Sequence, residues 1–391
     1  MKFRLSACLL SISLCGLLAC SSNTSFVATN GTGVVYIAAQ GDNTLTAYTA
    51  TLANGSLTIL GTAQSTGASP FAIAISPLLN AVFVDNIGSQ TISTYTLNSD
   101  TSLTAVTSTA KTGTMPMGMA IDPFGKFLFV ANQGSSTISV FSISGGTTLT
   151  EVADSPFTTI PAGTTVPTGP TSVAVSASGN FLYVSNTFTN TLSAYSISGT
   201  GSLTALGNSP YAVGLSPSGL AIPPNGSSLF VANTGSNTIS AFNICDKIVT
   251  TCTDVNHPDG TLKAVAGSPF SNGVGPVAIA IDPAFDFLYV LDRTSNQISS
   301  FSYGTGSGVL TPLSVTPTVS TGQAPASFVI VSGTTGINVG NTLTNPTDFV
   351  YVVNNESSTL SVFTLNTTTG VLTTLGLAAQ TSVNPTAVAA D

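Results

Sequence analysis

Few side chains in this sequence could serve as the acid, base or anion ligand of a catalytic site. The 391-residue chain has one histidine, His257, and two glutamates, Glu151 and Glu356. Beyond its first nineteen residues it also has a single arginine, Arg293. Hydrolysis of an ester-like bond needs a base to activate water and a cation or donor to stabilise the developing negative charge. Glu151 falls on a predicted outer strand and Glu356 in a predicted turn, where both are expected to be solvated, so His257 and Arg293 are the two candidate catalytic residues.

Both candidates also have an ordinary structural interpretation. His257 lies in a polar stretch, residues 245–259, next to Asp254, and a histidine in such a loop is usually solvated. Arg293 directly follows Asp292 in a predicted turn, which favours a surface ion pair of little energetic weight. The sequence alone therefore assigns no catalytic residue.

Other chemistries have even less support. The sequence contains no Gly-x-Ser-x-Gly elbow, no phosphate-binding Walker loop and no His-Glu-x-x-His motif. Residues 254–260 carry spaced oxygen ligands like those of a calcium loop, but the bidentate glutamate that should follow is missing. We expect neither a metal nor a cofactor.

A fourteen-residue block, which must position these side chains, occurs seven times without a gap. Each block has an aromatic residue at its second and fourteenth positions, and two apolar, β-branched runs flank a turn, which predicts a β-hairpin. The fifth position is Asn or Asp in six blocks, and its side chain is expected to bond the backbone two residues on and so fix the turn. The blocks are Val35–Tyr48, Val82–Tyr95, Leu128–Phe141, Leu182–Tyr195, Leu229–Phe242, Leu288–Phe301 and Val350–Phe363.

Two further strands accompany each hairpin. A Pro-x-x-apolar-small-apolar segment such as Pro70–Ile75 precedes most hairpins, and a Gly-x-Leu-Thr-like segment such as Gly55–Leu60 follows each one. Four strands in each of seven units predict an all-β fold, a seven-bladed β-propeller with four-stranded blades. The chain begins with a hairpin and ends with a Pro-type strand, so we expect Pro385–Ala390 to join the N-terminal hairpin and close the ring, which removes two open sheet edges.

Three insertions break the repeat, and connections between blades are where binding surfaces are often built. Residues 155–169 are expected on one face of the disc, and residues 245–259 and 331–348 on the opposite face. The alternative is length variation that the fold tolerates without a function.

The repeat resembles a known family. Its Tyr/Phe-Val-x-Asn and Thr-Ile/Leu-Ser-x-Tyr/Phe motifs resemble YVTN β-propeller repeats, and the longer units Ala120–Val130 and Ala280–Val290 resemble the seven-bladed lactonase family, which includes 6-phosphogluconolactonases. The resemblance covers roughly residues 33–391. It implies a central cleft in which active members use His, Glu and Arg side chains, and this chain is nearly devoid of those residue types.

The N-terminus predicts export. Lys2 and Arg4 precede a short apolar run, and Leu17–Cys20 resembles the lipobox of a bacterial lipoprotein, so residues 1–19 are expected to be a signal peptide. Cys20 would then carry the lipid, residues 20–32 would form a short tether, and residues 33–391 would form the propeller. An ordinary secretory signal is the alternative. The expected location is the bacterial cell envelope, at the outer membrane or cell surface.

Charge and cysteine content limit the partners. Loss of Lys2 and Arg4 with the signal leaves five basic residues against fifteen acidic ones, and such a surface repels nucleic acid and anionic lipid. Membrane attachment is therefore expected through the lipid on Cys20 alone. In an oxidising compartment Cys245 and Cys252 are expected to form a disulfide, with a zinc site as the alternative.

The sequence leaves two main functions open, and a structural role in a surface layer, suggested by the Thr/Ser-rich, charge-poor composition, is a third possibility. The favoured one is a monomeric, non-catalytic, lipid-anchored scaffold that binds an envelope ligand or partner. The alternative is an exported lactonase-type hydrolase that resembles 6-phosphogluconolactonase. If His257, Arg293 and a carboxylate meet at the mouth of the central channel, hydrolysis is favoured.

Overall fold

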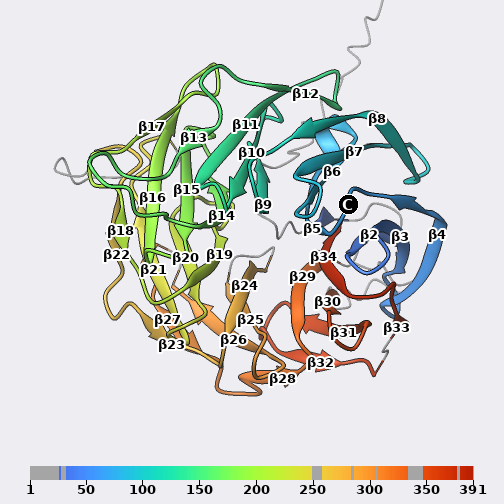
Figure 1. Cartoon of the computed structure of the whole chain (residues 1–391). Coiled ribbons are helices and arrows are strands. Elements are labelled where there is room, and N and C mark those ends of the chain that lie inside the picture. Colours follow the sequence, from blue (N-terminus) through green and yellow to red (C-terminus); the bar gives the residue numbers. More distant parts are fainter. Residues whose placement is uncertain are drawn as a thin grey trace, which may run out of the picture.

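Seven antiparallel sheets stand around a central axis in the computed structural model, which describes residues 26–27, 32–248, 258–282, 286–304, 306–332, 347–376 and 379–390 (Figure 1). Within these residues the only helical element is one short 3-10 turn, η1 (Pro77–Leu79). The predicted all-β, seven-bladed propeller with four-stranded blades is confirmed.

Each blade starts at the axis with a proline-led strand. These innermost strands are β5 (Pro70–Ser76), β9 (Pro116–Ile121), β14 (Pro170–Val175), β19 (Pro217–Ala221), β24 (Pro276–Ile281), β29 (Pro325–Ser332) and β34 (Pro385–Ala390). A proline lacks the N–H of a ladder bond, so it is tolerated at the first residue of a strand, which is where all seven stand.

The repeated block forms the next two strands. The second strands are β2 (Thr32–Ala39), β6 (Ala81–Asn86), β10 (Phe127–Asn132), β15 (Phe181–Asn186), β20 (Ser228–Asn233), β25 (Phe287–Asp292) and β30 (Thr347–Asn354). The third strands are β3 (Thr44–Thr51), β7 (Thr91–Leu97), β11 (Thr137–Ser144), β16 (Thr191–Ile197), β21 (Thr238–Ile244), β26 (Gln297–Tyr303) and β31 (Thr359–Asn366).

The outer edge of a blade is one strand or two short ones. It is continuous in the first two blades, as β4 (Ser56–Ser65) and β8 (Leu103–Lys111). In the other blades two short strands pair with the same third strand: β12 (Thr148–Glu151) and β13 (Phe157–Thr158), β17 (Leu203–Ala205) and β18 (Tyr211–Ala212), β22 (Leu262–Ala264) and β23 (Phe270–Ser271), β27 (Leu310–Pro312) and β28 (Thr318–Ser320), β32 (Leu372–Thr374) and β33 (Ala379–Gln380).

The C-terminal strand closes the ring as predicted. β34 pairs antiparallel with β2, with Val35 opposite Ala390 and Ala38 opposite Ala387, and forms the inner strand of the first blade (Figure 1). The first and last parts of the chain thus share one sheet, so the stability of that blade depends on both termini.

The aromatic at the second position of each block fills the space between neighbouring blades. All seven are fully buried: Tyr36, Phe83, Phe129, Tyr183, Phe230, Tyr289 and Tyr351. Four of them are tyrosines, and their hydroxyls donate to carbonyls in the following blade, as Tyr289 does to Gly370 at 2.9 Å and Tyr351 to Gly55 at 3.2 Å. Each tyrosine therefore packs and bonds adjacent blades at once.

The asparagine of the hairpin does not bond the backbone two residues on, so that expectation is wrong. In Asn132 the side-chain amide instead donates across the hairpin to Thr137 Oγ1 at 3.2 Å and Ser139 Oγ at 3.0 Å. Its carbonyl oxygen accepts from the N–H of Gly113 at 3.1 Å. The amide thereby joins both hairpin strands to the loop that leads into β9.

Part of the predicted tether, residues 20–32, is paired with the propeller. β1 (Phe26–Val27) lies parallel to the end of β29, with Phe26 opposite Val331. This contact is at the end of β29 remote from Pro325, so the N-terminal segment reaches the disc on the face where the innermost strands finish.

Candidate functional site

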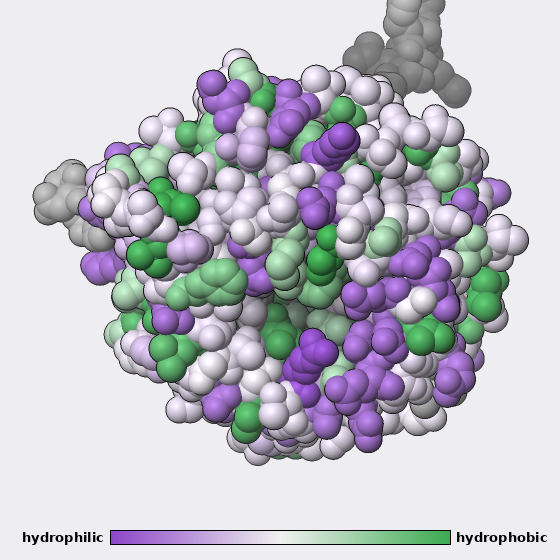
Figure 2. Space-filling model, viewed as in Figure 1, coloured by the Kyte–Doolittle hydropathy of each residue, from purple (hydrophilic) through white to green (hydrophobic). Residues whose placement is uncertain are grey.

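The central channel opens into a cavity on the face where the innermost strands begin. Its volume is about 320 Å³, and all seven blades contribute to its wall. Figure 2 shows the hollow near the middle of this face. The wall consists largely of the first residues after each strand-leading proline, and the rest comes from the hairpin turns. We call this cavity the channel mouth.

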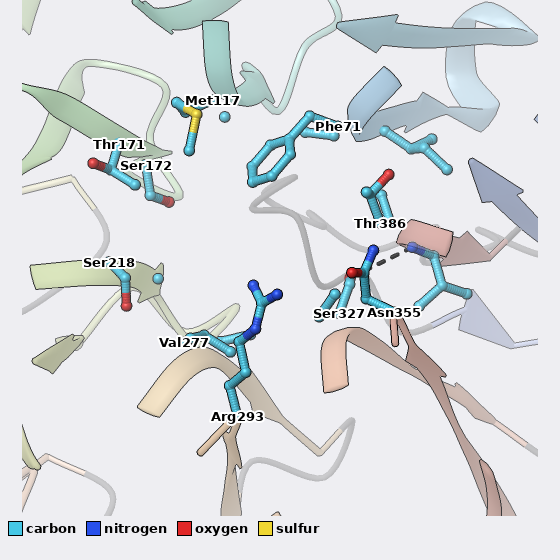
Figure 3. A pocket seen from close by; sticks show the side chains of 18 of the residues that line it. Phe71, Met117, Thr171, Ser172, Ser218, Val277, Arg293, Ser327, Asn355 and Thr386 are labelled. Carbon is cyan, nitrogen blue, oxygen red and sulfur yellow. Dashed lines mark hydrogen bonds between the residues drawn. The ribbon is translucent and has the colours of Figure 1, made fainter. Parts of the chain in front are cut away.

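The chemistry of the channel mouth differs from one side to the other. Phe71 and Met117 form an apolar arc, and in the remaining wall hydroxyl and amide side chains alternate with apolar ones such as Val277 (Figure 3). The polar members are Gln40, Thr171, Ser172, Ser218, Ser327, Asn355 and Thr386. An apolar wall with a few convergent polar groups is the usual form of a small-molecule site.

Arg293 is the single charged residue among the described residues that line the mouth. It follows β25 in a hairpin turn, and its guanidinium extends into the middle of the cavity, across from Phe71 (Figure 3). Within the described parts of the chain it has no side-chain hydrogen bond and no ion pair. Its donors are therefore available to an anionic ligand.

Comparison of the blades shows that Arg293 lacks a hydrogen bond that the equivalent residue makes to the next blade elsewhere in the ring. At the same position of three other blades the side chain donates to the carbonyl of the next blade's leading proline. The bonds are Thr187 to Pro217 at 2.7 Å, Thr234 to Pro276 at 2.6 Å and Asn355 to Pro385 at 3.1 Å. Arg293 makes no such bond, which leaves its charge directed at the cavity.

The expected surface ion pair between Asp292 and Arg293 is wrong. The Asp292 side chain is fully buried and turns inward, where its oxygens accept from the Ser299 hydroxyl and the Asn272 amide. Burial raises the pKa of Asp292 to about 6. Successive residues of a strand end point to opposite sides, so the carboxyl and the guanidinium separate.

The other sequence candidates do not meet Arg293 in the described structure. His257 lies outside the described residues, and the chain on either side of it, at Ile248 and Pro258, belongs to the connection between β21 and β22. The described ends of that connection lie on the face opposite the channel mouth, because they follow the end of β21 that is remote from its hairpin turn, and residues 249–257 lie outside the described residues. Glu151 is on an outer strand and accepts from Ser155 at 2.9 Å, and Glu356 is exposed in a turn.

Asp85 is a residue that the sequence reasoning missed. It lies on β6, is fully buried, and its Oδ1 accepts from the N–H of Ala72, in the wall of the mouth, at 2.6 Å. Burial raises the pKa of Asp85 to about 8. The available signal was a comparison of the repeats, because the fourth position of every other block is Ala, Ser, Leu or Val.

The cysteines are only partly described. Cys245 is buried and disulfide-bonded, while Cys252 and Cys20 lie outside the described residues, so their assigned roles stay predictions.

No group of three or more metal-binding side chains occurs among the residues that the structure describes. None of the helical segments in that part of the chain is long and apolar enough to span a membrane.

Comparison with known proteins agrees with the seven-bladed architecture. The family model for lactonase, a seven-bladed β-propeller, matches residues 2–111, 72–157, 144–250 and 249–389. No curated protein matches. Among solved structures, a candidate 6-phosphogluconolactonase from Bacteroides uniformis superposes with a TM-score of 0.73 at 17% identity, over 93% of this chain and all of that one.

A second solved structure is that of a periplasmic protein. The periplasmic gluconolactonase of Pseudomonas aeruginosa superposes with a TM-score of 0.69 at 18% identity, covering 92% of this chain and 99% of that one. Identities this low establish a common fold, and the site has to be interpreted from its own residues.

Proposed function

Because this chain belongs to the seven-bladed β-propeller lactonase family, we propose that its channel mouth binds a small sugar acid, or the lactone of one, that carries a single negative charge. The unpaired guanidinium of Arg293, extended into the cavity, is the observation that supports this most directly. A planar guanidinium binds a carboxylate through two parallel hydrogen bonds.

The remaining wall suits a polyhydroxylated ligand. Hydroxyl and amide groups from several blades, among them Ser172, Gln40 and Asn355, can exchange hydrogen bonds with sugar hydroxyls. Phe71 offers a flat apolar surface for the C–H face of a ring. Together these groups favour a compact carbohydrate-derived acid over an extended apolar molecule.

The charge balance disfavours phosphorylated lactones. A phosphate monoester carries close to two negative charges at neutral pH, and among the described residues Arg293 is the one cation that lines the cavity. The four lysines outside the predicted signal, Lys111, Lys126, Lys247 and Lys263, do not line it. With fifteen acidic residues in the chain, a dianion would be poorly compensated.

We propose binding, without a dedicated hydrolytic apparatus, as the main activity. No carboxylate or imidazole lines the mouth in the described structure, so no side chain there is placed to activate water. Lactone hydrolysis is the second candidate, because the chain is a lactonase family member and Arg293 could stabilise the oxyanion as water attacks the ring carbonyl.

Calorimetric titration distinguishes these proposals. We expect gluconate to bind the protein more tightly than 6-phosphogluconate does, and Arg293→Gln to weaken gluconate binding about 10–100-fold, since charge-assisted hydrogen bonds are lost. Arg293→Lys should recover only part of the affinity because an ammonium cannot form the paired bonds. Lys263→Gln, outside the mouth, is the matched charge control and should bind as the wild type does.

Two results would contradict the proposal. Equal gluconate binding by the wild type and Arg293→Gln would show that the channel mouth is not the binding site. Hydrolysis of gluconolactone well above the spontaneous rate, abolished by Arg293→Gln, would establish the second candidate as the function.

A further inference from the structure

Asp85 lies behind the apolar side of the channel mouth and contacts the backbone that forms this side. It lies on β6, and its carboxyl faces the start of the innermost strand β5, where the ladder between the two strands is irregular from Pro70 to Ile73. Asp85 Oδ1 accepts from the N–H of Ala72 at 2.6 Å, and the N–H of Phe71 also stabilises its charge. Phe71 and Ala72 both line the cavity.

The second oxygen of this carboxyl lacks a donor. Asp85 Oδ2 is buried and has no hydrogen-bond partner in the described structure. A buried carboxylate oxygen without a donor is costly, whereas a protonated oxygen can itself donate to a carbonyl. The geometry therefore favours the neutral acid.

The fourth blade shows what a proton donor does at this place. Ser185 occupies the same block position, and its hydroxyl accepts from the N–H of Ser172 at 3.1 Å. The same hydroxyl donates to the carbonyl of Ser218, in the next blade, at 2.7 Å. It therefore links an innermost strand to its neighbour in the ring. For Asp85, in the second blade, the corresponding carbonyl is that of Met117 in the third blade, the other member of the apolar arc.

We propose that Asp85 is a positioning residue of the channel mouth: as a neutral acid it joins the Phe71–Ala72 segment to the third blade, and loss of its proton releases the apolar side of the cavity. This rests on the proposed function, because the released wall is the one against which the ligand packs. A carboxylate can still accept from Ala72, but it can no longer donate to the next blade, and it repels a carbonyl.

Few other charges act on this group. β5, β7 and β9 pack against β6, and their one titratable side chain is Tyr95, whose hydroxyl donates to the carbonyl of Ser65 at 2.6 Å. Arg293 is the charged group across the mouth. Burial raises the pKa of Asp85 to about 8, which places the transition in the mildly alkaline range.

The first test needs no ligand. Methionine methyl resonances are recorded by NMR between pH 6 and 9.5, and those of Met117 and Met119 report on the second and third blades, which meet at Phe83 and Met119. We expect both signals to shift with a midpoint near pH 8 in the wild type and to stay constant in Asp85→Asn, whose amide can accept from Ala72 and donate onward. Asp85→Ser, which copies Ser185, is a second variant without the titrating group.

The second test measures gluconate affinity over the same pH range. We expect the wild type to lose about 5–10-fold in affinity above pH 8.5 and Asp85→Asn to keep its pH 6 affinity throughout. Asp292→Asn removes another buried carboxyl and restores the asparagine found in most of the repeats, so it should leave the pH 8 transition in place.

The two tests can fail separately. Methionine signals that do not titrate in the wild type, or that titrate equally in Asp85→Asn, overturn the role of Asp85. Signals that titrate as expected in a protein that binds no gluconate at any pH support the role of Asp85 and overturn the proposed function instead.

Discussion

Two residues near the channel mouth break the internal repeat, and both breaks introduce an ionisable side chain. Arg293 stands where four other blades use a side chain that bonds the next blade, and Asp85 stands where the other blocks have Ala, Ser, Leu or Val. Each change gives up a structural contact or introduces a buried ionisable group. Within a repeat protein, such local losses are expected at functional positions.

Asp85 should make the stability of the protein depend on pH. Its pKa is raised from 3.8 to about 8 by burial, so the folded state holds a proton that the unfolded chain releases. The stabilising effect of this proton is complete below about pH 4, falls as pH rises, and is lost above pH 8. We expect Asp85→Asn to unfold at a higher temperature than the wild type, and the gain in the free energy of unfolding to grow from about 1 kcal/mol at pH 4.5 to on the order of 5 kcal/mol at pH 9. Thermal unfolding at pH 4.5, 7 and 9 measures this, and a difference that does not change with pH would contradict it.

At the scale of the element, the hairpin asparagine joins strand, turn and loop. Asn132 bonds two hydroxyls across its hairpin and the N–H of Gly113. The same pair of hydroxyl contacts recurs at Asn186, Asn233 and Asn354. The turn is therefore stabilised by side-chain hydrogen bonds across the hairpin.

Asn132→Ala should lower the free energy of unfolding by about 1–3 kcal/mol, because it leaves buried polar groups without partners. Urea denaturation measures the change. Asn54→Ala is the control: this exposed turn residue also bonds an N–H, that of Ser56 at 3.0 Å, but solvent can replace it. Equal losses in both variants would show that burial of the amide is not what matters.

At the scale of the whole molecule, stability depends on ring closure. Deletion of Thr386–Asp391 removes most of β34, whose residues are all buried, and exposes the inner edge of the first blade. We expect a loss of several kcal/mol, on the order of the apolar area that is exposed. Calorimetry of the truncated chain measures it, with removal of Asp391 alone as the control that leaves β34 whole. An unchanged melting temperature in the longer deletion would contradict ring closure as a source of stability.

We propose that the disc is held at the cell envelope by a lipid on Cys20. β1 pairs at the face opposite the channel mouth, so a membrane anchor a few residues upstream would leave the mouth facing solvent. Cys20→Ser should release the protein into the soluble fraction and abolish labelling by a fatty-acid analogue. Membrane fractionation with normal labelling of the variant would contradict the anchor.

The sequence by itself determined the architecture. A block repeated seven times, with an aromatic at fixed positions and a proline-led partner strand, admits one closed arrangement, because each unit can bury its apolar faces only against its neighbours. Even ring closure by Pro385–Ala390 follows from counting strands. Only the tertiary structure decided the site. Whether the Arg293 guanidinium pairs with Asp292 or enters the channel depends on which side of the strand end each residue occupies. The burial of Asp85 depends on the third blade, which is distant in sequence. The local sequence pattern determines the repeated backbone geometry, whereas the pKa values and the directions of single side chains depend on contacts between blades.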